Sequence, residues 1–172
     1  MCTSLQVKGL LLADCMTEEV LRQIYARYPL VQCSEYNSFC PDIPHVIVDD
    51  YTTSKLAVAS LINKGCRKMG FFSAPYEYRY VQQRFRAFKT VLDSNEVTLC
   101  PEYIIQVADF SYQRILSAAR NFFRLPDPPD GIFAVSDKHA HAVIKAALER
   151  GIRIPEELKV IGVDDTMYAT LS

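Results

Sequence analysis

The stretch GIFAVSDKHAHAVIKAALERG, residues 131–151, decides the fold class of this chain. It opens with an apolar run at residues 131–135, which is typical of a buried strand. Polar Ser136 and Asp137 follow, and Gly151 supplies the permissive backbone on which a helix ends. Apolar residues recur between them at the spacing of one helix face, namely at Ala140, Val143, Ile144, Ala147 and Leu148. The stretch therefore predicts a strand, a polar turn and a helix in direct succession.

The same alternation extends along the rest of the chain. Further strands are predicted at residues 7–13, 30–34, 45–48, 69–73, 103–107 and 159–163. Helices are predicted at residues 17–28, 78–94 and 111–124, and another begins at Thr52 or Thr53 and ends at Lys64. Consecutive parallel strands connect through right-handed helical crossovers. We therefore predict an α/β fold, a parallel sheet with helices on both faces.

The composition excludes several classes of protein. The chain has 172 residues, of which 49% are hydrophobic and 23% charged, as in an ordinary folded globular protein. Its 19 basic and 20 acidic residues leave no positive excess to neutralise the phosphates of a nucleic acid. One segment does gather basic residues, which we interpret as a solvated helix face: Arg79, Arg84, Arg86 and Lys89.

The sequence contains no targeting, metal or cofactor motif. Residues 1–4 are polar, and the apolar run at residues 10–13 is too short for a secretory leader or a membrane span. The six cysteines form no C-x-x-C pair, and no glycine-rich phosphate loop follows a predicted strand. We therefore expect a cytoplasmic protein that contacts no membrane and needs no cofactor.

Polar residues follow nearly every predicted strand. They are Asp14, Glu35, Asp49, Asp50, Ser73, Asp109, Ser136, Asp137, Asp164 and Asp165. Ligands of open parallel sheets bind outside the carboxyl ends of the strands, where these side chains meet. Carboxylates accept hydrogen bonds at several positions, which suits a ligand with many hydroxyl groups, such as a sugar or a nucleoside. The alternative is that each of these residues caps the helix that follows it.

Two further residues extend this candidate site. Phe110 lies among the polar positions, directly before a predicted helix, where its ring could cover a sugar or base. A place in the core is its alternative. Arg84 lies between Val81 and Phe85 at the border of an apolar helix stripe, and its fork of donors could reach inward. Its alternative is exposure to solvent.

An enzymatic function has less support. The histidines at positions 45, 139 and 141 have no Ser or Cys partner in a recognisable arrangement, and the latter two point in different directions on one helix. The strand-end carboxylates could bind magnesium, so a metal-dependent hydrolase or phosphatase that uses Asp14, Asp49 or Asp137 is one alternative. No flanking motif supports it, and we expect a protein without catalytic activity.

Six strings, in the same order, resemble the effector-binding region of the LacI/GalR family of transcription regulators. They are PHVIVDD (44–50), LINKGCRKMGFFSAP (61–75), QQRFRAFKTVL (82–92), VADFSYQR (107–114), IFAVSDKHAHAVIKAAL (132–148) and IPEELKVIGVDD (154–165). The fold of this region in the family is that of type I periplasmic binding proteins. The combined match is specific because its parts span nearly the whole chain after Ile43.

The resemblance implies an organisation and a function. Residues 1–47 correspond to part of the first lobe of the effector-binding region and residues 48–172 to the second, with the helix-turn-helix head outside this chain. The effector-contacting positions that match the family are Arg84, Phe110 and Asp137, with Glu35, Asp49 and Ser73 as looser matches. We therefore expect a homodimeric regulator that binds a sugar or nucleoside effector and contacts DNA only through the absent helix-turn-helix.

Some residues depart from the family pattern, and one alternative to the regulator remains. Ser136 stands where an Asn is frequent beside Asp137, and His141 stands where a Gly is frequent. The alternative is a solute-binding protein of a sugar uptake system, which shares the fold and the mode of ligand binding. The missing leader and the unpaired cysteines argue against that alternative.

Overall fold

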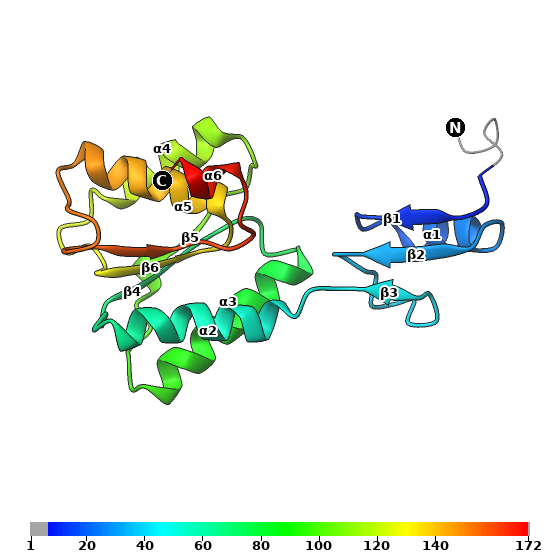
Figure 1. Cartoon of the computed structure of the whole chain (residues 1–172), viewed down its shortest axis with the longest axis horizontal. Coiled ribbons are helices and arrows are strands. Elements are labelled where there is room, and N and C mark those ends of the chain that lie inside the picture. The colour runs from blue at the N-terminus through cyan, green and yellow to red at the C-terminus, as the bar shows by residue number, and fades with distance from the viewer. Residues whose placement is uncertain (1–6, 172) are drawn as a thin grey trace. The chain divides into compact units, whose positions relative to one another are not determined.

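The computed structural model describes residues 7–171, and the chain forms two compact units, with the boundary along the sequence between Asp49 and Asp50 (Figure 1). Each unit has its own parallel sheet. No helix among the described residues is long and apolar enough to cross a membrane.

The first unit is a three-stranded parallel sheet with one helix. Its strands β1 (Leu10–Leu12), β2 (Leu30–Cys33) and β3 (His45–Val46) lie in that order, and Leu10 pairs with Leu30. Helix α1 (Glu18–Tyr25) connects β1 to β2. The core of this unit is formed by Leu21, Leu30, Cys40 and Ile43.

The second unit is built on a four-stranded sheet in the order β5-β4-β6-β7, with every pair parallel. The strands are β4 (Met69–Ser73), β5 (Ile104–Gln106), β6 (Gly131–Ala134) and β7 (Lys159–Ile161). Every residue of the two central strands, β4 and β6, is buried. Continuous apolar runs are expected of strands that are covered on both faces.

Helices cover both faces of this sheet (Figure 1). Helices α2 (Asp50–Asn63) and α3 (Arg79–Ser94) pack on one face, and α4 (Tyr112–Phe122) and α5 (Asp137–Glu149) pack on the other. Because side chains alternate along a strand, Phe71 and Phe133 belong to the core under α2 and α3, whereas Phe72 and Ile132 belong to the core under α4 and α5. The predicted α/β class, with helices on both faces, is confirmed.

The structure corrects several predicted boundaries. Helix α2 begins at Asp50 rather than at Thr52 or Thr53, because a carboxylate is favourable at the positive end of a helix and Asp50 also pairs with an arginine. The strand predicted at 103–107 is shorter, since residues 101–103 form the 3-10 turn η1 (Pro101–Tyr103). The short helix α6 (Met167–Thr170) was not predicted.

Strand β4 has the predicted bounds, but the other remaining strands are shorter than predicted. The run at 45–48 contributes only β3, since its partner β2 ends at Cys33 and Ser34 turns the chain with a φ of 69°. A strand ends where its partner stops offering backbone groups to pair with, and no local pattern records that point.

Candidate functional site

Arg84 is the centre of the best-defined polar network at the carboxyl end of the second sheet. The residue is only 6% exposed. The Nε atom donates to Asp50 Oδ1 at 3.0 Å, and Nη2 lies 2.8 Å from the same oxygen. Nη2 also donates to Asp164 Oδ1 at 3.2 Å, and Nη1 donates to the carbonyl oxygen of Val135. Arg84 thus reaches inward from α3, as the sequence allowed, and is not part of a solvated face.

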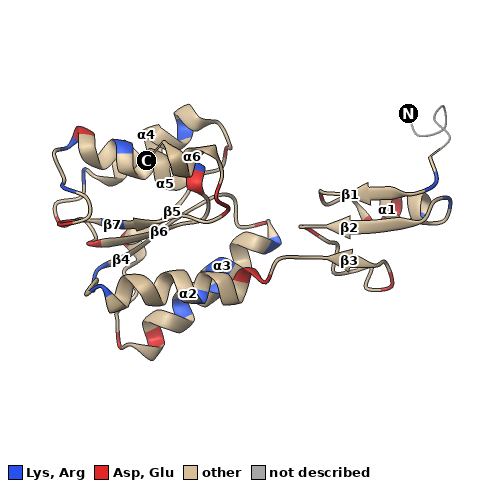
Figure 2. Ribbon diagram, in the orientation of Figure 1, with Lys and Arg blue, Asp and Glu red and all other residues tan. Residues whose placement is uncertain are grey.

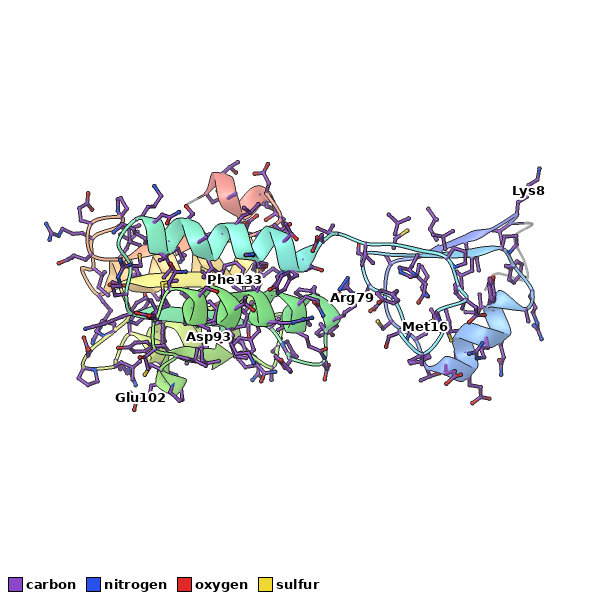
Figure 3. All side chains as sticks on the ribbon, turned by 90° about the horizontal axis from the view of Figure 1, so that it is seen from below. Lys8, Met16, Arg79, Asp93, Glu102 and Phe133 are labelled. Carbon is purple, nitrogen blue, oxygen red and sulfur yellow. The ribbon has the colours of Figure 1, made fainter. Side chains whose placement is uncertain are left out.

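The other basic residues of the segment also lie on α3, where Lys and Arg positions are blue in Figure 2. Arg86 and Lys89 are exposed on α3, where each cation lies over an aromatic ring. Arg79 begins α3, and Asp93 lies near its other end (Figure 3). The solvated-face interpretation therefore fits Arg86 and Lys89 and is wrong for Arg84. It does not describe Arg79 either, whose side chain is 18% exposed and pairs with Asp50.

The environment of Arg84 is acidic on two sides. Asp50 is 4% exposed, and Arg79 Nη2 lies 3.9 Å from its second oxygen, Oδ2. The side chain of Asp164 is 41% exposed. A guanidinium group stays protonated in proteins, so its burial requires such anionic partners. Asp50 is the internal partner of Arg84, whereas Asp164 connects the arginine to the surface.

The loop that carries Asp164 has an unusual backbone. Asp164 has a φ of 105° and Asp165 a φ of 52°. Residues other than glycine seldom adopt positive φ, although Asp and Asn tolerate it better than most. Strained residues of this kind gather at functional sites. The loop after β7 is therefore a candidate ligand-contacting segment.

Aromatic rings extend the network away from Arg84. The Arg84 guanidinium lies 5.1 Å from the ring centre of Tyr80, and the Tyr78 and Tyr80 rings are 5.8 Å apart. Tyr78 and Phe110 meet edge to face at 5.3 Å. Phe110 is 43% exposed, so it is not a core residue. We call Tyr80, Tyr78 and Phe110 the aromatic row. The sequence does contain a signal for it that was not used, namely two tyrosines two positions apart at the start of a predicted helix.

Asp137 is buried, and its carboxylate already accepts hydrogen bonds from within the chain. Its Oδ2 atom accepts from the backbone N–H of Thr166 at 2.6 Å and from the Thr166 hydroxyl at 3.2 Å. A Cβ on Gly162 would lie 2.7 Å from Asp137 Oδ1, so only glycine fits there without a shift. Asp137 thus links the start of α5 to the loop after β7, and its contact with an effector stays a prediction.

Ser73 and Asp109 form hydrogen bonds with backbone groups of the chain itself. Ser73 is buried, and its hydroxyl lies within hydrogen-bond distance of the carbonyl oxygens of Ala74 and Ile105. Asp109 accepts from the Ser111 N–H at 2.6 Å. Asp109 thus bonds to Ser111, the N-cap residue of α4, and does not itself cap the helix. The Ser73 hydroxyl has carbonyl oxygens of the chain as partners.

Glu35 and Asp49 belong to the first unit. Glu35 is buried and Asp49 is exposed. The structure brings together Arg84, Asp50, Asp164 and Phe110 within the second unit. The participation of Glu35 and Asp49 in the same site stays a prediction.

His139 has a serine partner, contrary to the sequence-based interpretation. Its Nδ1 atom lies 2.8 Å from Ser136 Oγ. Burial, and to a lesser extent the charge of Lys138, lowers the pKa of His139 from 6.5 to about 4. An imidazole with so low a pKa is a weak base near neutral pH, so the pair is poorly suited to activate a nucleophile. Among residues 7–171, no group of three His, Cys, Asp or Glu side chains could hold a metal ion.

Comparison with known proteins decides the family. A sequence profile described as a periplasmic binding protein-like domain matches residues 58–172, which is most of the chain. The chain belongs to this family. The periplasmic binding protein-like match includes β4, β6 and the aromatic row, and it confirms the resemblance drawn from the sequence strings.

The relatives are LacI-family repressors. This chain is 29% identical over 131 residues to the HTH-type transcriptional repressor CytR of Escherichia coli, covering 75% of this chain and 38% of that protein. It is 33% identical over 122 residues to the ribose operon repressor of Bacillus subtilis, covering 71% of this chain and 36% of that protein. The chain thus spans less than half the length of these relatives, which are regulators rather than enzymes.

Solved structures agree with this assignment. A transcription regulator from Lactobacillus plantarum superposes with a TM-score of 0.87 at 25% identity, covering 98% of this chain and 64% of the other. The likeness in fold to this regulator therefore covers residues of both units of the chain.

Proposed function

We propose that this chain is the ligand-sensing part of a LacI-type transcription regulator and that it binds a small polyhydroxylated effector, a sugar or a nucleoside. The observation that carries the proposal is the buried Arg84 guanidinium, held between Asp50 and Asp164 at the carboxyl end of a parallel sheet. Ligands of such sheets bind at this edge.

Arg84 and Asp164 together are suited to bind a hydroxyl group of a ligand. A hydroxyl both donates and accepts a hydrogen bond. The Asp164 carboxylate, which is partly exposed, accepts from such a group, and the neighbouring guanidinium donates to it. A ligand with several adjacent hydroxyls satisfies both partners at once, which an apolar ligand does not.

The aromatic row supports a ring-shaped effector. Phe110 presents an exposed ring, and Tyr78 holds it at its edge. Flat apolar faces of this kind contact the apolar face of a sugar or base and exclude water from it. The ribose operon repressor, by its name, is a relative that regulates a ribose operon, and it makes D-ribose a first compound to test.

The regulatory role follows from the family. In this proposal the parent protein is a cytoplasmic homodimer that binds DNA through a helix-turn-helix, and the effector changes its affinity for DNA. An effector shifts such an equilibrium only by its different affinities for the two states. The ligand site therefore also has to differ between these two states.

Calorimetric titration of the full chain tests the ligand site. The panel is D-ribose, D-glucose, cellobiose and adenosine, and at least one compound is expected to bind. Asp164→Asn removes the charge and keeps a residue that tolerates positive φ, so the loop is retained. We expect this variant to lose about tenfold or more in affinity, as for a charge-assisted hydrogen bond.

Asp165→Asn is the matched control, because Asp165 is the exposed neighbour and also has positive φ. It is expected to bind like the unmodified chain. Binding of no panel compound, or equal losses in the two variants, would contradict the proposal.

A further inference from the structure

Three aromatic side chains from α4, α5 and α6 meet in the second unit. Tyr168 of α6 stacks on Tyr112 of α4, with their ring centres 5.9 Å apart and their planes at 14° to each other. The His141 ring of α5 lies 5.8 Å from the Tyr168 ring and 5.7 Å from the Tyr112 ring. Ring centres about 4.5–7 Å apart are favourable for aromatic pairs. We call Tyr112, His141 and Tyr168 the aromatic clasp, because each ring contacts the other two.

Tyr168 is the side chain that packs within its segment. Among residues 164–171, all of which the structure describes, only Tyr168 is partly buried, and the others are exposed. Helix α6, which is four residues long, lies beside α5 (Figure 1). A single helical turn is not stable by itself in water. The position of α6 therefore depends on packing, and Tyr168 supplies it.

The two partners of Tyr168 belong to well-packed helices. Tyr112 lies in the first turn of α4 against the core under α4 and α5, and its hydroxyl oxygen is buried. His141 lies one helical turn after Asp137 on α5, so their side chains share a face. Helix α5 thus holds the loop after β7 at two points, Thr166 through Asp137 and Tyr168 through His141. A glycine, which is frequent at position 141 in the family, would supply no ring.

The segment before the clasp needs such restraints. Asp164 and Asp165 both have positive φ. Strained backbone of this kind persists only where the surrounding contacts impose it. Strand β7 fixes the chain before the strained pair, and the contacts of Thr166 and Tyr168 fix it afterwards. Loss of the aromatic contacts would remove one of the restraints that keep these φ values.

We propose that the aromatic clasp holds the loop after β7 in the conformation that presents Asp164 to the effector, with His141 as a positioning residue. The inference rests on the proposed function, in which the Asp164 carboxylate binds a hydroxyl group. Phe110, the exposed ring of the proposed site, lies two residues before Tyr112, and Asp164 lies four residues before Tyr168. The clasp thus connects the two segments that carry the exposed site residues.

Amide hydrogen exchange of the ¹⁵N-labelled full chain tests the clasp without any ligand. The Thr166 N–H, which donates to Asp137, reports on the loop, and the Val135 N–H, which donates to the Phe72 carbonyl oxygen, reports on the central sheet. Thr166 is expected to exchange faster than Val135, because a loop opens without global unfolding. We expect His141→Ala to speed exchange at Thr166 by about two- to tenfold, as for the loss of an aromatic pair.

Two further variants of α5 are the controls. His141→Phe keeps a ring at this position and is expected to exchange at Thr166 like the unmodified chain. Lys145→Ala removes an exposed side chain one turn further along the helix and is expected to have no effect. Faster exchange at Val135 without a change at Thr166 would overturn the inference, since His141 would then stabilise the fold but not the loop. An equal effect of His141→Phe and His141→Ala would also overturn it.

Titration of the panel compound that binds tests the consequence for the effector. The apparent affinity falls as the binding-competent conformation becomes rarer. Because a strained loop relaxes when a restraint is lost, His141→Ala is expected to weaken binding by about two- to tenfold, and His141→Phe to retain the affinity. When Asp164 is already asparagine, His141→Ala is expected to have a smaller further effect.

Unchanged affinity in His141→Ala, or an equal loss with and without the Asp164 carboxylate, would overturn the inference even if Asp164→Asn confirms the ligand site. If no panel compound binds, the proposed function fails, and exchange at Thr166 alone decides whether the clasp holds the loop.

Discussion

Truncation of Arg84 tests whether the buried ion pair organises the second unit. In Arg84→Ala, the buried Asp50 carboxylate loses the guanidinium that lies 2.8 Å away, and the Val135 carbonyl oxygen loses its side-chain donor. Breaking a buried ion pair by removing one partner costs about 3–5 kcal/mol. Asp50 would keep only the more distant Arg79, whose Nη2 atom lies 3.9 Å from Asp50 Oδ2. For a chain of this size, that corresponds to a fall of about 6–20 °C in the melting temperature.

The assay is urea unfolding at pH 7, followed by circular dichroism, together with a thermal melt. Arg86→Ala is the control on the same helix. Its side chain is exposed and lies over Tyr51 with a distance of 5.4 Å to the ring centre. We expect Arg86→Ala to lose no more than about 1 kcal/mol, as is usual for an exposed cation–π contact.

A double variant separates charge from packing. Arg84→Met combined with Asp50→Asn removes both charges and keeps most of the side-chain volume. Replacement of a buried ion pair by uncharged groups is often neutral, so this variant is expected to recover much of the stability lost in Arg84→Ala. If Arg84→Ala unfolds within about 0.5 kcal/mol of the unmodified chain, as surface substitutions do, the reasoning is refuted.

Three further predictions concern pH, a glycine and the aromatic row. The pKa of His139 is about 4 in the folded chain and 6.5 for a free histidine side chain. Between these two pH values the histidine is protonated in the unfolded chain but not in the folded chain. The folded chain therefore loses stability as the pH falls from about 6.5 to 4. This histidine accounts for about 3 kcal/mol of that loss, and urea unfolding at pH 7 and pH 4.5 should show a smaller pH dependence in His139→Phe than in the unmodified chain. Gly162→Ala should destabilise the chain by about 1–3 kcal/mol in the same assay, because its Cβ would meet Asp137 Oδ1 at 2.7 Å; an unchanged midpoint would show that α5 and the loop after β7 can separate at no cost. Phe110→Ala should leave the melting temperature unchanged, since the ring is 43% exposed, yet reduce effector affinity by up to about tenfold; a fall in stability without a change in affinity would assign Phe110 to packing.

The order and type of the main elements could be predicted from the sequence. Strand β4 has the predicted bounds, and α3 and α5 lie where apolar residues recur at helical spacing. These signals are local, because side-chain periodicity follows from the geometry of a single helix or strand. Arg84 was also placed correctly beside the apolar stripe of its helix, since that depends only on the same spacing.

The partners of the site residues could not be predicted in this way. The acceptors of Arg84 lie 34, 51 and 80 residues away along the chain, at Asp50, Val135 and Asp164. Asp137 reaches Thr166 across 29 residues. Even the local pair of Ser136 and His139 was missed, because a serine before a helix is ordinarily interpreted as its cap.

The sequence by itself therefore determined the α/β class, the position of each main element and the edge of the sheet at which polar residues gather. Only the tertiary structure decided which polar residues are available at that edge. It assigned Asp50 and Asp137 to internal hydrogen bonds and left Asp164 and Phe110 exposed. The physical reason is that hydrogen-bond partners depend on the strand order β5-β4-β6-β7, which brings distant loops together and which no local spacing along the chain encodes.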